Sequence, residues 1–206
     1  MDFSVLRLQA DEEEAGSEQR AAPRFVSLIR AAKLILPQGE FVCVIRDVSA
    51  SGLKVRTFHA LPPMPNGAVL ELQNGEQFAL QLVRDEDGEA SFTFRDPVEV
   101  DRLIKEHWSH PKRQFRLSIC LPATLHTLTA TSLGSISNIS QQGARLSSDA
   151  LFARDEMLRI EAPELPEIRA KVRWRRNGEY GVVFENTFRL AEIAHLAARL
   201  QCPNLL

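Results

Sequence analysis

A short motif occurs twice in this chain of 206 residues, each time combining a hydrogen-bond acceptor, a hydroxyl and a glycine. A pair of basic residues with three residues between them precedes each copy, by 23 residues in the first and 22 in the second. Because two independent motifs recur in the same order at matching separations, chance is a poor explanation. The residues concerned are Arg20, Arg24, Asp47, Ser49 and Gly52 in the first copy, and Lys112, Arg113, Arg116, Asn138, Ser140 and Gly143 in the second.

These residue types suit a ligand that carries both phosphates and purine bases. The planar guanidinium of arginine pairs with phosphate oxygens or with the O6/N7 edge of guanine, and it stacks on bases. A carboxylate such as Asp47 accepts hydrogen bonds from guanine, and the amide of Asn138 accepts without a charge. Serine adds a hydroxyl, and glycine permits close approach or a positive φ. Taken alone, each motif also fits a solvated surface arginine or an ordinary turn before a strand.

The motifs belong to a longer internal repeat with an offset of 90–91 residues. Segment 44–55 aligns with 135–146, and segment 81–94 aligns with 170–184. One offset shared by several segments favours duplication of a domain over chance similarity between β-rich stretches.

Short apolar or alternating segments, separated by turn residues, predict strands throughout both repeats. Asn74-Gly75 and Asp87-Gly88 favour tight turns between antiparallel strands. Helical spacing predicts helices over 97–108, capped by Asp96, and over 188–200. The expected fold is all-β with short helices, namely two tandem six-stranded antiparallel β-barrels, each followed by an α-helix. The predicted strands are 25–29, 41–45, 53–58, 69–73, 78–83 and 90–94, then 117–125, 131–137, 144–148, 157–161, 168–174 and 180–185.

The paired motifs resemble those of the PilZ family of bacterial cyclic di-GMP receptors, and the resemblance runs from Arg20 to about Leu200. In that family the arginine motif lies on the segment leading into the barrel and closes over intercalated cyclic di-GMP, with the second motif beneath it. The resemblance implies a second-messenger receptor and not an enzyme, with the residues of both motifs as ligand contacts. It also implies outputs such as control of motility, exopolysaccharide and biofilm, and virulence.

The second copy resembles the family more closely at the start of its barrel, in segment 113–123. Asn138 is an accepted variant of aspartate in the family. Lys112 departs from the family pattern because an ammonium lacks the bidentate fork of arginine, and Arg113 is the residue that can compensate.

The expected domain limits are an acidic, disordered tail at 1–19, a first barrel at 20–96, a linking helix at 97–111, and a second barrel with its terminal helix at 112–206. We expect helix 97–108 to pack between the barrels. Helix 188–200 is expected to cover the second barrel or to form the surface of a homodimer.

Composition limits the other classes. The net charge of −2 argues against a broad basic surface for nucleic acid. Cys43, Cys120 and Cys202 are far apart and form no CxxC pair, which favours inert thiols over zinc or disulfides. The N-terminal segment is acidic, and no apolar run approaches the roughly 20 residues of a membrane span. We therefore expect a cytoplasmic protein without a membrane span, metal or cofactor, apart from its ligand.

Two alternatives and one ambiguous segment remain open at this point. One or both sites could be vestigial, which would leave a ligand-independent scaffold that binds an unidentified protein partner. An RNA-binding barrel needs a continuous basic face with stacked aromatics, which the charge balance disfavours. The basic segment 171–176 is interpreted as a charged strand and turn near the ligand site. Trp174 either packs in the core, which is the preferred interpretation, or lies against a base.

Overall fold

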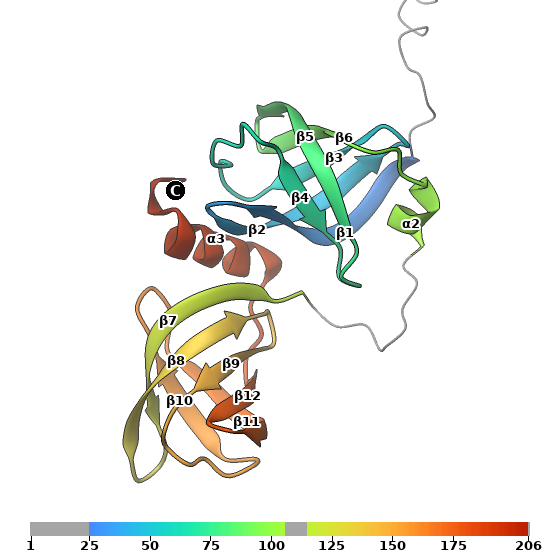
Figure 1. The fold of residues 1–206 in the computed structure, drawn as a ribbon. Helices are drawn as coiled ribbons and strands as arrows, with labels where there is room; N and C mark the ends of the chain where they lie inside the picture. Colours follow the sequence, from blue (N-terminus) through green and yellow to red (C-terminus); the bar gives the residue numbers. More distant parts are fainter. Residues whose placement is uncertain (1–24, 106–114, 206) are drawn as a thin grey trace, which may run out of the picture.

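The structure, a computed structural model, describes residues 25–105 and 115–205, with side chains from Ile29 onward (Figure 1). The acidic segment at 1–19 lies outside this range. The described chain forms two closed antiparallel β-barrels of six strands, each followed by a helix. This confirms the predicted fold class.

The two barrels have the same strand order. In the first barrel the order around the ring is β1-β2-β3-β6-β5-β4, and in the second it is β7-β8-β9-β12-β11-β10. The strands of the first barrel are β1 (Phe25–Leu36), β2 (Gly39–Val48), β3 (Gly52–Thr57), β4 (Ala68–Glu71), β5 (Gln77–Glu86) and β6 (Glu89–Phe94). Those of the second are β7 (Leu117–His126), β8 (Thr131–Ile139), β9 (Gly143–Ser147), β10 (Met157–Glu161), β11 (Ile168–Arg176) and β12 (Glu179–Phe184).

The register of the strands confirms that the halves are repeats. The β5–β6 turn has positive φ at Asp87 and Gly88, and the β11–β12 turn has it at Asn177 and Gly178. Asp, Asn and Gly tolerate the positive φ that tight hairpin turns require. Bulges also recur, just before Asp47 in β2 and just before Asn138 in β8. A bulge bends its strand and changes the direction of the side chain that follows it. Both motifs therefore begin directly after a β-bulge.

Alternation of apolar and polar side chains builds both cores. Along β7 and β10 every second residue points inward, as the two-residue period of a strand requires. The first core contains large side chains such as Phe41 and Leu70, and the second contains Phe152 and Tyr180, all almost fully buried. Each barrel therefore has a hydrophobic core of its own.

Strand β1 is longer than the sequence predicted. The prediction ended at residue 29, but the strand continues to Leu36. The segment contains Arg30 and Lys33, which are poor strand formers, and local propensity hid its true length. Lys33 is nevertheless 94% buried, since its relative exposure is 6%, and the reason lies in the contact between the barrels.

The helices differ from the prediction in length and place. Helix α2 (Val100–Ile104) covers only part of the predicted 97–108, and residues beyond 105 lie outside the described range. It packs on the first barrel, where Arg30 donates hydrogen bonds to the carbonyls of Leu103 and Ile104. Helix α3 (Leu190–Gln201) matches the predicted 188–200 within two residues.

The element between the barrels is α3 and not the helix expected there, as Figure 1 shows. Its buried residues pack in one cluster with Val42 of β2 and close the second barrel. Nε2 of His195 lies 2.7 Å from the carbonyl oxygen of Phe58 in the first barrel. The side chain of Gln201 forms two hydrogen bonds with the main chain of Glu40. The prediction that helix 97–108 packs between the barrels was wrong, because the apolar side chains of its described part pack on the core of the first barrel alone.

Candidate ligand-binding site

Two residues of the second-copy motifs meet at the start of the second barrel. Arg116 lies directly before β7, and its Nη1 donates a hydrogen bond of 3.3 Å to Oδ1 of Asn138 on β8. Arg116 and Asn138 are close together because Leu117 pairs with Ile139, which aligns the start of β7 with the end of β8. Arg116 is exposed and Asn138 is half-buried, so both present polar atoms at the surface. Lys112 and Arg113 lie outside the described residues.

The serine and glycine of the motif brace a turn in both copies. The main-chain N–H of Ser140 donates to the carbonyl of Gly143 at 2.8 Å, and its hydroxyl donates to the same oxygen at 3.1 Å. Ser49 and Gly52 repeat both contacts at the same distances. Both serines are buried, with exposures of 7% and 8% respectively. These hydroxyls serve the turn between two strands, as in an ST-turn.

The glycines of the motif are required by strand packing. A Cβ at Gly143 would overlap the carbonyl oxygen of Val182, and one at Gly52 would overlap that of Phe92. Neither glycine is recorded with a positive φ, so the constraint is close approach of two backbones. The serine and the glycine of each motif therefore shape the turn between two neighbouring strands of the barrel.

Three residues that the sequence analysis did not assign to the site continue the row that contains Asn138. The register pairs Asn138 with Arg145, Arg145 with Gly181, and Gly181 with Trp174. The guanidinium carbon of Arg145 lies 5.8 Å from the ring centroid of Trp174, within the range of a cation–π contact. Trp174 is 37% exposed on the outer face, so its placement in the core was wrong. A bulge before Trp174 breaks the alternation on which that placement depended.

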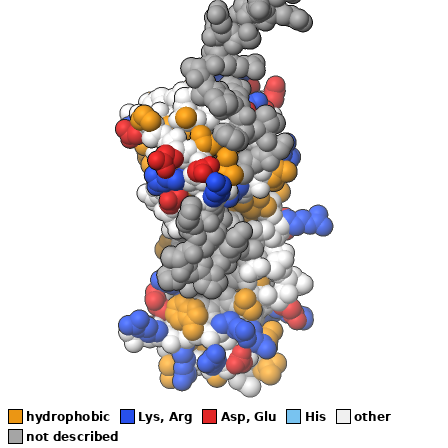
Figure 2. Space-filling model, turned by 90° about the vertical axis from the view of Figure 1, so that its right-hand side faces the viewer, with side chains coloured by type: hydrophobic (Ala, Val, Ile, Leu, Met, Phe, Trp, Pro, Cys, Tyr) orange, Lys and Arg blue, Asp and Glu red, His pale blue; other side chains and the backbone are white. Residues whose placement is uncertain are grey.

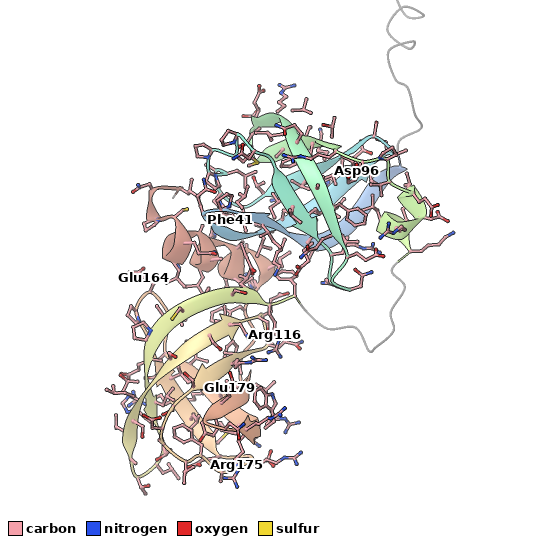
Figure 3. The ribbon with its side chains drawn as sticks, in the orientation of Figure 1. Phe41, Asp96, Arg116, Glu164, Arg175 and Glu179 are labelled. Carbon is pink, nitrogen blue, oxygen red and sulfur yellow. The ribbon has the colours of Figure 1, made fainter. Side chains whose placement is uncertain are left out.

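This outer face is rich in cations. Figure 3 places Arg116, Glu179 and Arg175 on the same side of the second barrel. Figure 2 turns that side to the viewer and shows Lys and Arg side chains gathered over the second barrel. Arg173, Arg175 and Arg176 of β11 are all exposed, and Arg173 lies 3.3 Å from Asp155. Such a face favours an anionic ligand.

In the first barrel, the described motif residues line one cavity. Asp47, Ser49 and Gly52 border a hollow of about 190 Å³ together with Lys54 and other residues of β3 and β6. Asp47 pairs in register with Val26 of β1, as Asn138 pairs with Ser118 of β7. Arg20 and Arg24 lie outside the described residues.

The row on the first barrel has different chemistry. Lys54, Ser91 and Arg84 occupy the places of Arg145, Gly181 and Trp174. Each cation there is held by a neighbouring carboxylate. Lys54 lies 3.0 Å from Glu89, whose carboxyl pKa it lowers by a hydrogen bond and by its charge, and Arg84 pairs with Glu86. The first barrel therefore offers no aromatic surface for a base in this row.

Two other kinds of site find no support in the part of the chain that the structure describes. No group of three or more His, Cys, Asp or Glu side chains in residues 25–105 and 115–205 could hold a metal ion. Among these same residues, no helix has the length and hydropathy needed to cross a membrane.

Residues 111–201 match the family model of the PilZ domain. The second barrel and α3 therefore match the PilZ domain, and the resemblance inferred from the motifs is confirmed for this part of the chain. A comparison with curated proteins finds no match.

The solved structures that match this chain include three proteins of low identity. The inhibitor of motility MotI/DgrA of Bacillus subtilis is 16% identical, with 87% of this chain and 99% of that chain covered, at a TM-score of 0.37. PlzA of Borreliella burgdorferi, in complex with c-di-GMP, is 15% identical, with 94% and 99% covered, at 0.32. YcgR of Escherichia coli, also in complex with c-di-GMP, is 12% identical, with 93% and 85% covered, at 0.33. At these values the family assignment depends on the family model and not on these neighbours.

Proposed function

We propose that this protein is a receptor for cyclic di-GMP, not an enzyme, and that it binds the dinucleotide on the outer face of its second barrel. The observation that carries this proposal is the contact between Arg116 and Asn138 on the barrel that matches the PilZ model. It joins the two motifs, 22 residues apart in sequence, in one polar surface.

The chemistry of the face suits both parts of the ligand. The guanidinium of Arg116 offers a fork for phosphate oxygens or for the O6/N7 edge of guanine. The amide of Asn138 hydrogen-bonds a base edge. The indole of Trp174 offers a surface on which a base stacks, and Arg145 beside it adds positive charge. Lys112 and Arg113 are proposed to complete the cationic side.

The second barrel is the main site in this proposal, and the first barrel is a scaffold. Ser91 and Arg84 replace the glycine and tryptophan of the row, so the row has no aromatic ring on which a base could stack. Its two cations pair with Glu89 and Glu86, and Arg145 of the second barrel likewise lies 3.7 Å from Glu179, so the indole is the difference between the two rows. Arg20, Arg24, Asp47, Ser49 and Gly52 remain candidates for a second, weaker site. The ligand-independent scaffold considered for the whole protein thus finds its support in the first barrel alone.

The proposed output is a change in the arrangement of the barrels or in a surface that binds a protein partner or a second copy of the chain. The proposed compartment is the cytoplasm, where the dinucleotide is the messenger. The domain limits 20–96 and 112–206 are kept as part of this proposal, because 20–24 and 112–114 lie outside the described residues.

A calorimetric titration of the full chain with cyclic di-GMP tests the proposal. Arg116→Ala should weaken binding by about 10- to 100-fold, since it removes a charge-assisted hydrogen bond. Arg169→Ala is the matched control, because Arg169 is also an exposed arginine but lies near the opposite end of β11 from Trp174. Absence of heat from folded wild-type protein at tens of micromolar ligand, or equal losses in both variants, would refute the receptor function.

A further inference from the structure

The start of β7 has an edge that the second barrel does not cover. Strand β10 pairs with β7 only at Thr124–His126, at the other end of the strand. Leu117 pairs with Ile139 of β8, and the N–H of Ser118 and the C=O of Arg116 on either side of it point to the opposite edge, toward the first barrel. A backbone N–H and C=O on such an edge pair either with water or with groups of another element.

The first barrel supplies those partners through two charged side chains. Oε2 of Glu40 accepts a hydrogen bond of 2.9 Å from the main-chain N–H of Ser118. Nζ of Lys33 donates one of 3.2 Å to the carbonyl oxygen of Arg116. Side chains of one domain therefore take the place of a neighbouring strand in the other.

The two charged side chains are themselves held firmly. Nζ of Lys33 lies 3.1 Å from Oε2 of Glu40 and 2.9 Å from Oε1 of Glu71, and the side-chain exposures are 7%, 16% and 22% in that order. The main chain of Glu40 is fixed on its other side by Gln201 of α3, which accepts from its N–H at 2.7 Å and donates to its carbonyl at 2.9 Å. A charge network buried this well has few alternative geometries.

We propose that Lys33 and Glu40 of the first barrel are positioning residues for the ligand site of the second, which they act on through the main chain of Arg116 and Ser118. This inference rests on the proposed function, because the side chain that it positions is the guanidinium that faces Asn138. With the barrels docked, the segment is held with Arg116 beside Asn138 and the site is preorganised. Docking of the barrels and binding of the dinucleotide then favour each other, and the coupling is reciprocal.

The chain offers a matched set of variants. Glu40→Ala removes both the ion pair with Lys33 and the acceptor for Ser118. Glu40→Gln removes the charge but keeps an oxygen that accepts from Ser118. Glu71→Ala also removes an ion pair of Lys33. The recorded contacts of Glu71 lie within the first barrel, to Lys33 and Gln77, so the hydrogen bonds of Lys33 and Glu40 to the main chain of Arg116 and Ser118 are retained.

Calorimetry of the full-length variants gives the first readout. Glu40→Ala should weaken cyclic di-GMP binding by about tenfold, which corresponds to about 1.4 kcal/mol. Glu40→Gln should recover most of the affinity, and Glu71→Ala should remain within about twofold of wild type. Equal affinities of wild type and Glu40→Ala, or an equal loss in Glu71→Ala, would overturn the inference.

The amide resonance of Ser118 gives a second readout that needs no ligand. Glu40→Ala should shift this resonance upfield and accelerate its hydrogen exchange about tenfold or more relative to wild type, whereas Glu71→Ala should do neither. If the wild type fails to bind cyclic di-GMP but this pattern holds, the proposed function fails while the positioning contact stands. If the Ser118 amide is the same in Glu40→Ala and wild type, the positioning role is wrong, whatever the ligand does.

Discussion

The indole of Trp174 lies over Gly181, its cross-strand partner, so that a Cβ at position 181 would overlap the ring. The first barrel has Ser91 opposite Arg84 at this place. One pair presents an aromatic surface beside Arg145, and the other presents a cation already engaged by Glu86. The repeat has thus kept its strands while the outer face of its two copies diverged.

Gly181→Ala should displace the indole of Trp174. We expect altered tryptophan emission in a Trp108→Phe background, and cyclic di-GMP binding weakened by about tenfold, the value of a lost base stack. Ser91→Ala is the control in the first barrel, because Ser91 already carries a Cβ, and it should change neither quantity. Unchanged emission in Gly181→Ala would show that the ring does not depend on this glycine.

Asn138→Ala and Asp47→Ala compare the two copies at equivalent positions. Asn138→Ala should lower the affinity for cyclic di-GMP by about tenfold, because it removes the hydrogen-bonding partner of Arg116 and the amide proposed to bind a base edge. Asp47→Ala should change it by less than about twofold. The measurement is calorimetric stoichiometry and affinity on the full chain. The reverse order of effects would move the main site to the first barrel.

Gly143→Ala and Gly52→Ala should destabilise the fold in the absence of any ligand. Each new methyl group would meet a carbonyl oxygen of the neighbouring strand, so the unfolding free energy should fall by about 1–3 kcal/mol. Denaturant unfolding followed by circular dichroism measures this. Gly75→Ala tests φ strain alone, since no atom lies within 4 Å of its added Cβ. Full stability with lost binding would instead assign these glycines to ligand approach.

Stability should fall as the pH drops below the ordinary range of histidine, in part through His59. Burial lowers the pKa of His59, the hydrogen bond from its Nδ1 to the carbonyl of Ala60 opposes this, and the charge of His195 lowers it further. The folded state therefore prefers the neutral ring. Its contribution is fully present above the unfolded pKa of about 6.5 and is lost as the pH falls through the lower, folded value. Melting temperatures at pH 7.5 and 5.5 should differ less in His59→Gln than in wild type.

The thiols should differ in reactivity. Cys43 is fully buried in the first core, and burial raises the pKa of its thiol far above the usual range. Cys120 is exposed on β7. A thiol reagent should label Cys120 in native protein and reach Cys43 only after unfolding. Mass spectrometry of labelled peptides gives the answer, and rapid labelling of Cys43 under native conditions would contradict the packing of β2.

Much of the fold could be predicted because the repeat doubled each weak signal. The turn at Asp87-Gly88 occurs where expected, and Asn177-Gly178 forms the equivalent turn of the second barrel. Strand β1 was cut short at residue 29 because Arg30 and Lys33 oppose strand formation locally. Lys33 is buried between two carboxylates of its own barrel and the carbonyl of Arg116 in the second barrel, and none of these partners is visible in local sequence.

The candidate site could be predicted only in part, for a similar reason. Arg116 and Asn138 were found because their spacing recurs, and the structure brings them together. Arg145 and Trp174 share no motif with them and join the row only through strand register. Gly181 lies beneath Trp174 on β12, and Gly143 on β9 pairs with Val183 of the same strand. These two glycines were the available signals, but only the strand register relates them to each other.

The placement of α3 has a practical consequence for dissecting the molecule. Its apolar residues pack with Val42 of the first barrel, and Gln201 binds the main chain of Glu40. If the two halves were expressed separately, the first half would lose α3 as a cover. The second half would expose the apolar side chains of α3 that pack on the first barrel, and an exposed apolar surface promotes self-association. Properties measured on the fragments would therefore not add up to those of the intact chain.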